Sequence, residues 1–292
     1  MNRMQHLEAV LRERDRLEAS GLRQCRAASL LLLSGLIRDF RAGRSPEGHI
    51  REFTGHAARV LSEGVVAAHM SGKLFTFRRA ADSRGRVGLS GEFDEAVEFL
   101  RRKLRSKGNA EGLRTIYGPE IGKVTEDLSG LLRKRVSSVF SEAVEKGLSR
   151  DQAVNFLRER VKELGIAADK PAALETLFRS EISVAYSAGQ WNAAMDPDVM
   201  PGLWGFEYVT MRDDKVRPAH AAMDGVTLRK DHPLWLMITP PNGWNCRCTL
   251  MELFEPADEV LPPKWTTDHK GRRIPVGPDE GWGFNAGRLF RG

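Results

Sequence analysis

Residues 212–248 read RDDKVRPAHAAMDGVTLRKDHPLWLMITPPNGWNCRC, and this stretch decides the fold of the second half of the chain. It holds two of the three cysteines, two of the seven histidines and two of the six tryptophans. Proline and glycine interrupt it too often for a long amphipathic helix, so it predicts short strands and turns. We therefore expect a small, turn-rich domain to form around it.

Three side chains of this stretch, His220, Cys246 and Cys248, form a candidate zinc site. Thiolate and imidazole are the ligands that zinc prefers, and a structural site normally uses four ligands. A disulfide is a poor alternative, because the two cysteines are one residue apart and Cys25 falls in a distant predicted helix. The candidates for the fourth ligand are Asp213, Asp214, His232 and water.

The same cysteines also fit a purely structural interpretation. Residues 246–251, C-R-C-T-L-M, have the composition of a short buried strand, in which cysteine acts as a small hydrophobic side chain. His220 would then be a satisfied polar residue on a helical turn. The triplet lacks the paired C-x-x-C spacing of strong zinc motifs, so both interpretations stay open.

The first 195 residues predict mainly long helices. Apolar residues recur three or four apart over residues 3–41, which indicates one helix, or two with a break near Gly21. The first members of this stripe are Leu7, Val10, Leu11, Leu17 and Leu22. Further helices are expected over residues 46–70, 90–106, 119–146 and 171–195, and Ser149 with Gln152 forms a capping-box pattern.

The chain divides into two expected regions, and together they predict an α+β fold. Residues 1–169 form a helical region, and residues 170–292 form a small α+β domain rich in turns. The segment from about residue 71 to residue 91 is rich in glycine and arginine and poor in long apolar side chains. It predicts a mobile loop within the helical region.

The second region contains signals for one strand, one turn and a terminal arm. LWGFEYVTM, residues 203–211, is rich in aromatic and β-branched residues and alternates like a strand. Asp224 and Gly225 form a turn signal after it. From Pro256 onward the Pro, Gly and Trp content is typical of an extended arm, and we expect Trp282 and Phe284 to anchor it on the domain.

Composition and charge limit the classes of protein. With 41% hydrophobic and 29% charged residues the chain is ordinary for a soluble protein, and its longest apolar run, residues 27–37, is too short for a bilayer. The first residues are too charged for a secretory signal, and three cysteines fit a reducing cytoplasm. Residues 1–107 hold 21 Lys and Arg against 13 Asp and Glu, which favours a solvated surface, nucleic acid or an acidic partner.

The order of the motifs resembles the phage head morphogenesis family of Mu F-like proteins over roughly residues 170 to 290. W-N-C-R-C and P-D-E-G-W-G-F-N-A-G are its most specific pieces in combination. The matching single residues are Arg179, Glu181, Asp213, Arg217, His220, Asp224, Gly225, Trp244, Asn245, Cys246, Arg247 and Cys248. Some branches of the family carry C-P-x-C in place of residues 217–220 and H-P-x-C-R-C in place of residues 243–248, so two potential metal ligands of those branches are absent here.

This resemblance implies a minor head protein of a tailed phage or prophage that acts in prohead assembly near the portal vertex, with DNA packaging or ejection as a further role. Its expected partners are the portal and other head proteins, with non-specific contact to packaged DNA and none to a membrane. We expect it in the virion and, during assembly, in the host cytoplasm. No enzyme activity and no resident cofactor other than the candidate zinc are expected.

The alternative is a phage-borne effector, metal-dependent or similar to ADP-ribosyltransferases, that is delivered with the DNA. Relatives of the domain are sometimes attached to toxin-like modules, and Arg179, Ser180 and Glu181 loosely resemble a transferase triplet. Candidate acids, bases and nucleophiles exist in His220, Asp213, Asp214, Glu181 and the two cysteines. None of them has a recognised catalytic spacing, which favours the structural interpretation.

Overall fold

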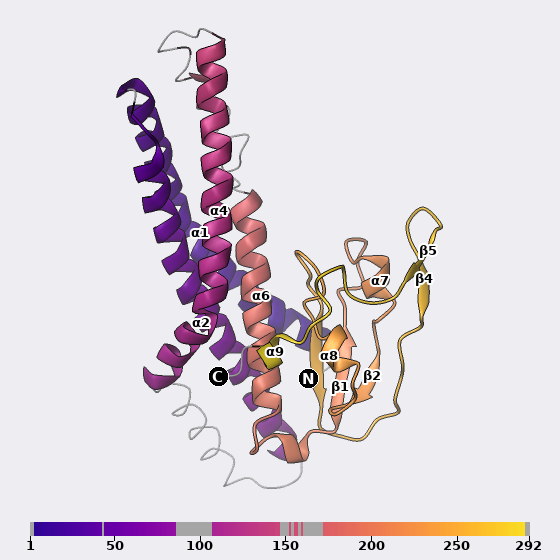
Figure 1. Cartoon of the computed structure of the whole chain (residues 1–292). Helices are drawn as coiled ribbons and strands as arrows, with labels where there is room; N and C mark the ends of the chain where they lie inside the picture. The colour runs from indigo at the N-terminus through magenta and orange to yellow at the C-terminus, as the bar shows by residue number, and fades with distance from the viewer. Residues whose placement is uncertain are drawn as a thin grey trace. The chain divides into compact units, whose positions relative to one another are not determined.

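The computed structural model describes residues 3–42, 44–85, 107–146, 152, 155, 156, 159 and 172–289. Within this part the chain is α+β, as the sequence predicts, with long helices first and a small strand-containing region after them (Figure 1). The long helices are α1 (Arg3–Ala42), α2 (Glu47–Gly85), α4 (Lys107–Glu145) and α6 (Ala172–Ala194). The predicted helix over residues 90–106 lies wholly outside the described residues, and so does the predicted cap at Ser149.

Short elements follow α6. They are η1 (Met200–Gly202), β1 (Gly205–Val209), α7 (Pro218–Ala221), β2 (Thr227–Arg229), α8 (Trp235–Ile238), β3 (Thr249–Leu253), β4 (Trp265–Thr267), β5 (Arg273–Pro275) and α9 (Ala286–Leu289). An antiparallel sheet has the order β2-β1-β3, and β4 pairs with β5 in a separate hairpin. The predicted turn is confirmed, since Gly225 has a φ of +84°, a conformation that glycine adopts without steric cost.

The chain forms two compact units, and each is assembled from segments that are distant in sequence. Unit 1 comprises Met1–Leu17, Val65–Ile116 and Arg179–Gly292. Unit 2 comprises Glu18–Gly64 and Tyr117–Phe178. The division expected from the sequence is sequential, whereas the small sheet shares its unit with the start of α1 and the second half of α2.

Helix α1 is continuous through Gly21, because its buried positions recur every three or four residues along its whole length. These positions are Leu7, Val10, Arg14, Glu18, Gly21, Cys25, Ser29, Leu32, Leu36 and Asp39. Three of them, Arg14, Glu18 and Asp39, are charged residues. Leu11, Leu17 and Leu22, which the sequence placed on the buried face, are only half-buried. None of the described helices combines the length and the apolar character that a bilayer span requires.

In unit 2 the turn between α1 and α2 is fixed by Asp39. This buried carboxylate lies 3.2 Å from Nε of Arg44 and 3.0 Å from Nδ1 of His49. The helices approach closely here, since a Cβ at Gly35 would stand 1.6 Å from the His49 ring. The helix end that the sequence predicts near Gly43 is therefore confirmed and held by side chains from both helices.

The mobile loop predicted over residues 71–91 is wrong for residues 71–85, which continue α2 as regular helix. Phe77 and Ala80 are buried with Ala193 and Val199 in one apolar cluster. The glycine that suggested a loop marks a close helix approach instead, because a Cβ at Gly72 would stand 2.1 Å from the Tyr186 carbonyl oxygen. Tertiary packing thus outweighs the low local helix propensity, and residues 86–91 lie outside the described part.

The core of unit 1 lies between α6 and the sheet. Trp191 of α6 stacks on Phe206 of β1 at a centroid distance of 5.1 Å, and Trp235 of α8 meets the same ring edge-on at 5.7 Å. The predicted anchoring of the arm is confirmed, because Trp282 and Phe284 pack against buried residues of α6. These contacts give the turn-rich segment a rigid support.

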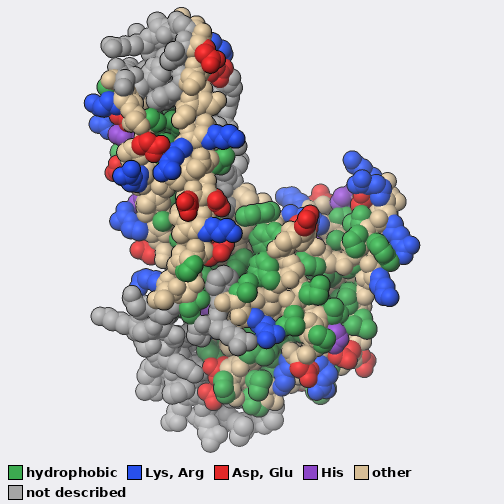
Figure 2. All heavy atoms as spheres, in the orientation of Figure 1, with side chains coloured by type: hydrophobic (Ala, Val, Ile, Leu, Met, Phe, Trp, Pro, Cys, Tyr) green, Lys and Arg blue, Asp and Glu red, His purple; other side chains and the backbone are tan. Residues whose placement is uncertain are grey.

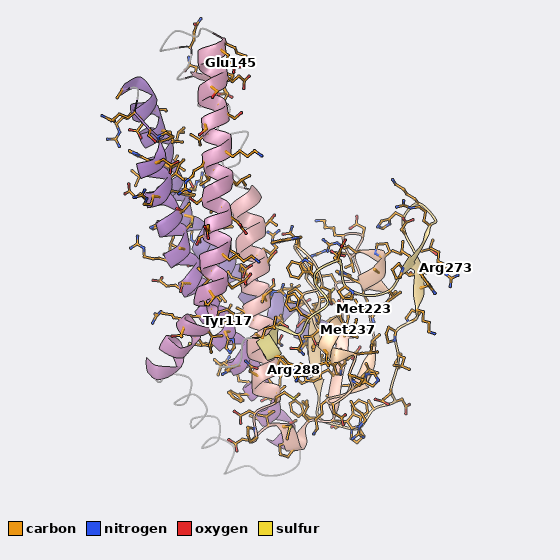
Figure 3. The ribbon with its side chains drawn as sticks, in the orientation of Figure 1. Tyr117, Glu145, Met223, Met237, Arg273 and Arg288 are labelled. Atoms are coloured by element: carbon orange, nitrogen blue, oxygen red, sulfur yellow. The ribbon has the colours of Figure 1, made fainter. Side chains whose placement is uncertain are left out.

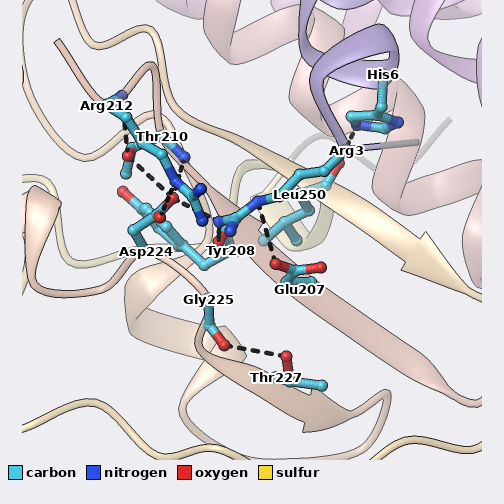
Figure 4. A network of polar contacts seen from close by, with 10 residues as sticks. All are labelled: Arg3, His6, Glu207, Tyr208, Thr210, Arg212, Asp224, Gly225, Thr227 and Leu250. Carbon is cyan, nitrogen blue, oxygen red and sulfur yellow. Dashed lines mark hydrogen bonds and ion pairs between the residues drawn. The ribbon is translucent and has the colours of Figure 1, made fainter.

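Polar side chains of α1 reach the sheet within unit 1 (Figure 4). Nη2 of Arg3 lies 2.5 Å from Oδ1 of Asp224, and its Nε lies 3.1 Å from Oε1 of Glu207. The His6 ring lies between two partners, with Nε2 2.9 Å from the Leu250 carbonyl oxygen and Nδ1 3.0 Å from Nη1 of Arg79. This arrangement suits the neutral ring, which donates from Nε2 and accepts at Nδ1.

We expect the protein to lose stability as the pH falls below about 6.5. Burial and then the Arg79 charge lower the pKa of His6 to about 3, so the unfolded chain takes up a proton between these values that the folded chain does not. His6→Gln should reduce the slope of the unfolding free energy by up to about 1.4 kcal/mol per pH unit in this window. Urea denaturation across the pH range measures this slope, with His269→Gln on the exposed hairpin as the control. Equal slopes in wild type and His6→Gln would contradict the assignment.

Candidate functional site

His220, Cys246 and Cys248 lie together in unit 1, as the sequence hypothesis requires. Their ligand atoms all lie within 4.8 Å of one another, and all three residues are buried. Nδ1 of His220 is 3.8 Å from Sγ of Cys246. Both cysteines are free thiols, so no disulfide competes for the sulfur atoms.

Local backbone geometry brings the three residues together. His220 lies on α7, whose first position is Pro218, a residue that fixes φ for a helix start. The cysteines follow the turn at residues 240–245, in which Asn245 has a φ of +58°, a left-handed conformation that asparagine tolerates. The C-R-C triplet therefore ends a turn, and β3 begins only after it.

A fully buried asparagine, Asn242, stabilises this turn through two side-chain hydrogen bonds. Oδ1 of Asn242 accepts a hydrogen bond of 2.8 Å from the Tyr208 hydroxyl group, and its Nδ2 donates to the Thr239 carbonyl oxygen at 3.3 Å. Tyr208 is itself buried on β1. The central strand thus fixes the turn that carries the cysteines.

Asp279 of the terminal arm completes the surroundings of His220. Its Oδ1 lies 3.4 Å from Nε2 of His220, and its Oδ2 lies 3.2 Å from Nε of Arg217. The approach requires Gly243, since a Cβ there would stand 2.1 Å from Asp279 Oδ2. Asp279 belongs to the P-D-E-G-W-G-F-N-A-G motif, but the sequence gave no signal that it faces the histidine.

The protein side chains considered as a fourth ligand lie elsewhere. Asp213 forms a two-pronged ion pair with Arg247, with both N to O distances at 2.8 Å. Asp214 is exposed. His232 accepts a hydrogen bond from the Leu234 amide and lines a separate cavity of about 670 Å³. Within the described residues, the group of mutually close ligands contains only His220, Cys246 and Cys248.

The pKa values of the two thiols are shifted in opposite directions. Contact with Cys248, followed by the hydrogen bond with His220, lowers the pKa of Cys246 well below its ordinary value, although burial opposes this. Contact with Cys246 and burial raise the pKa of Cys248 well above its ordinary value. One sulfur is therefore predisposed to the thiolate form in which cysteine binds metals.

Arg14 of α1 forms hydrogen bonds with the main chain of this turn. Its buried guanidinium donates to the carbonyl oxygen of Cys246 at 2.9 Å, to that of Cys248 at 3.4 Å and to the Ser183 hydroxyl group. The sequence did not reveal this residue, because an arginine in a charged helix normally faces solvent. The indication in the sequence that Arg14 is buried is its position on the apolar stripe of α1.

The remaining motif residues gather in two places. Near the turn, Nη1 of Arg179 donates to Oδ1 of Asn245 at 3.3 Å, and Nη2 of Arg217 donates to the Trp244 carbonyl oxygen at 2.7 Å. Asp224 lies in the other group, with Arg3, Thr210 and Arg212 (Figure 4). Glu181 lies half-buried on α6.

The cluster is better suited to bind a metal ion than to act as a nucleophile. The cysteines are 3% and 4% exposed, so a substrate has little access to either sulfur as a nucleophile. Two sulfurs and one imidazole nitrogen form a donor set for a soft or borderline metal ion. Trp244, by contrast, is half-exposed and contacts Trp282 edge-on at 5.3 Å, which joins the turn to the arm.

Comparison with known proteins confirms the resemblance to the head morphogenesis family. Residues 134–251 match the family described as Phage Mu protein F like protein. A protein named "Putative capsid assembly protein F" from Escherichia phage Mu is 26% identical over 189 residues, covering 50% of this chain and 42% of that protein. The Mu-like prophage FluMu F protein of Haemophilus influenzae is 29% identical over 126 residues, covering 39% of this chain and 30% of its own length.

The likeness extends beyond phages but stays partial. An uncharacterised protein of Methanocaldococcus jannaschii is 27% identical over 113 residues, covering 38% of this chain and 16% of that protein. The chain thus spans less than half the length of the curated relatives it matches. No solved structure matches it.

Replacing Arg14 by methionine should destabilise the protein by about 3 kcal/mol, because two buried carbonyl oxygens lose their donor. Methionine keeps the aliphatic stem, so packing changes little. Arg16→Met is the matched control, since this exposed residue forms an i,i+3 ion pair with Glu13 and its replacement should cost about 0.5 kcal/mol. Urea denaturation measures both values, and equal losses would show that the buried bonds of Arg14 contribute little.

Proposed function

Because residues 134–251 match the Mu F-like family, we propose that the chain is a structural head protein of a tailed phage or prophage that acts in capsid assembly. The observation that carries this proposal is that the matched segment contains the turn, α7 and the motif contacts around His220. The names of two similar proteins refer to a capsid assembly protein F and a prophage F protein. Its proposed place is the portal vertex, as a minor component of the virion that assembles in the host cytoplasm.

The contacts of the motif residues favour this structural role over the effector alternative. Arg179 is engaged with Asn245, and both thiols are buried behind the turn. A transferase would need its arginine and glutamate at an open cavity with a ligand between them. We therefore do not propose an enzymatic function.

A phage or prophage that lacks this protein should yield defective or non-infectious heads. The physical reason is that a minor assembly protein supplies contacts between other head proteins that no other subunit makes. Electron microscopy of purified particles and infectious titre measure the effect, and expression of the wild-type chain from a plasmid is the control. Normal yields of infectious particles without the protein would contradict the proposal.

Contact with packaged DNA is the second part of the proposed role, and the β4–β5 hairpin is its proposed surface. Residues 264–273 contain four Lys or Arg and one carboxylate, Asp268. The carboxylate is used within the turn, where it accepts hydrogen bonds from the Lys270 and Arg272 amides. Figure 2 shows Lys and Arg side chains gathered along the edge where Figure 1 places this hairpin.

The shape of the hairpin also suits a nucleic acid. Trp265, Thr267, Arg273 and Pro275 share one exposed face, and Arg273 lies 4.6 Å from the Trp265 ring centroid. Figure 3 labels Arg273 on this hairpin. A two-stranded ribbon of this width fits the major groove of duplex DNA, and cations at its tip can contact phosphates.

Neutralising the hairpin should weaken the binding of duplex DNA. Lys270→Ala with Arg273→Ala should lower the affinity roughly tenfold. It should also reduce the slope of log affinity against log salt concentration by about 2, because fewer phosphate contacts release fewer counterions on binding. Arg51→Ala with Arg59→Ala removes the same charge from exposed positions of α2 and is the control. Fluorescence anisotropy with a labelled duplex at several salt concentrations measures both. Equal losses would mean that only net charge matters, and normal DNA binding with loss from heads would indicate a protein partner.

A further inference from the structure

The distances among the three buried ligands are close to those of a tetrahedral zinc site. Zinc to sulfur bonds of about 2.3 Å and zinc to nitrogen bonds of about 2.0 Å place the ligand atoms about 3.5 to 3.8 Å apart. Nδ1 of His220 lies 3.8 Å from Sγ of Cys246, and no pair within the cluster exceeds 4.8 Å. Small side-chain adjustments therefore suffice to close the site on an ion.

The orientation of His220 decides which nitrogen is the ligand. Its Nδ1 faces Cys246, whereas its Nε2 is buried, makes no close hydrogen bond and lies 3.4 Å from Oδ1 of Asp279. When one imidazole nitrogen binds a metal, the proton resides on the other, and a carboxylate commonly accepts it. The orphaned Nε2 and the facing carboxylate match this arrangement.

Two contacts orient Asp279 so that it can accept the Nε2 proton of His220. Its amide donates to the Asn242 carbonyl oxygen at 2.8 Å, and Arg217 lies 3.2 Å from Oδ2. Both contacts leave Oδ1 directed at His220. The terminal arm thus closes one side of the cluster.

The charges around the cluster also favour a bound dication. Two thiolates would bring two negative charges into a buried region, whereas Asp279 is partly exposed and already paired with Arg217. A divalent ion supplies two positive charges and offsets those of the two thiolates. Burial of a neutral set avoids the large cost of an uncompensated internal charge.

We propose that His220 through Nδ1, Cys246 and Cys248 bind one zinc ion, and that Asp279 is a positioning residue that orients the histidine. Water takes the fourth position, since no other potential ligand among the described residues joins the cluster. Soft thiolates select zinc over magnesium or calcium. The ion would fix the C-R-C turn to α7 and, through Asp279, to the arm.

Metal content of the full chain tests the ligands. Protein purified without chelator, or reconstituted with zinc salt and desalted, should carry about one zinc ion per chain by elemental analysis. Cys246→Ser and Cys248→Ser should lose it. Cys25→Ser is the matched control, since it removes a buried free thiol outside the cluster and should keep the full content. Wild type without zinc after reconstitution, or equal loss in Cys25→Ser, would overturn the proposal.

A second measurement separates metal binding from folding. Cobalt added to the metal-free wild-type chain should give the thiolate charge-transfer and visible bands of a four-coordinate site. Asp279→Asn should keep these bands and lower zinc affinity by about 10- to 100-fold in competition with a chromogenic chelator. Unchanged zinc affinity in Asp279→Asn would contradict the positioning role of Asp279. The absence of cobalt bands in the wild-type chain would contradict the metal site itself. Neither readout depends on head assembly, so the proposed function can fail separately.

Discussion

The hydrogen bonds from Arg14 to the cysteine carbonyl oxygens are the interaction on which the rest of unit 1 depends. A guanidinium removed from water must find acceptors for its N–H groups, and here the acceptors are main-chain oxygens of the C-R-C turn and the Ser183 hydroxyl group. This requirement fixes α1, α6 and the turn to one another at a single point. The position of the sulfur atoms relative to α7 follows from it.

Further polar contacts repeat this pattern along the sheet. Arg79 of α2 lies with Nε 2.9 Å from the buried Glu252 carboxylate of β3, and Thr76 donates to the same carboxylate. Arg3 and His6 of α1 contact β1 and β3. A sheet of three short strands buries little apolar area by itself, so the two helices supply partners that it lacks. The small domain is therefore complete only with segments from the helical region.

The sequence predicted the elements that rest on local periodicity and turn chemistry. The stripe of α1, the strand over residues 203–211, the Gly225 turn and the aromatic anchors of the arm all follow from spacing. It failed where a residue has a tertiary role that contradicts its usual one. Gly72 suggested a loop and serves a close helix contact. Arg14 suggested a solvated helix face and Arg79 fell in the predicted mobile loop, but both are largely buried. For the site, the three candidate ligands came from composition, but Asp279 required the fold to bring the arm back to α7.

The discontinuous construction of unit 1 has a consequence for its synthesis on the ribosome. The first segment of the unit leaves the exit tunnel early, but its partners in α6, the sheet and the arm are translated last. Until then Arg14 and His6 have no acceptors, while residues of unit 2 between these segments can already form local helix contacts. Closing such a long loop costs conformational entropy before the distant contacts repay it. The order of synthesis thus delays the completed surface until nearly the whole described chain exists.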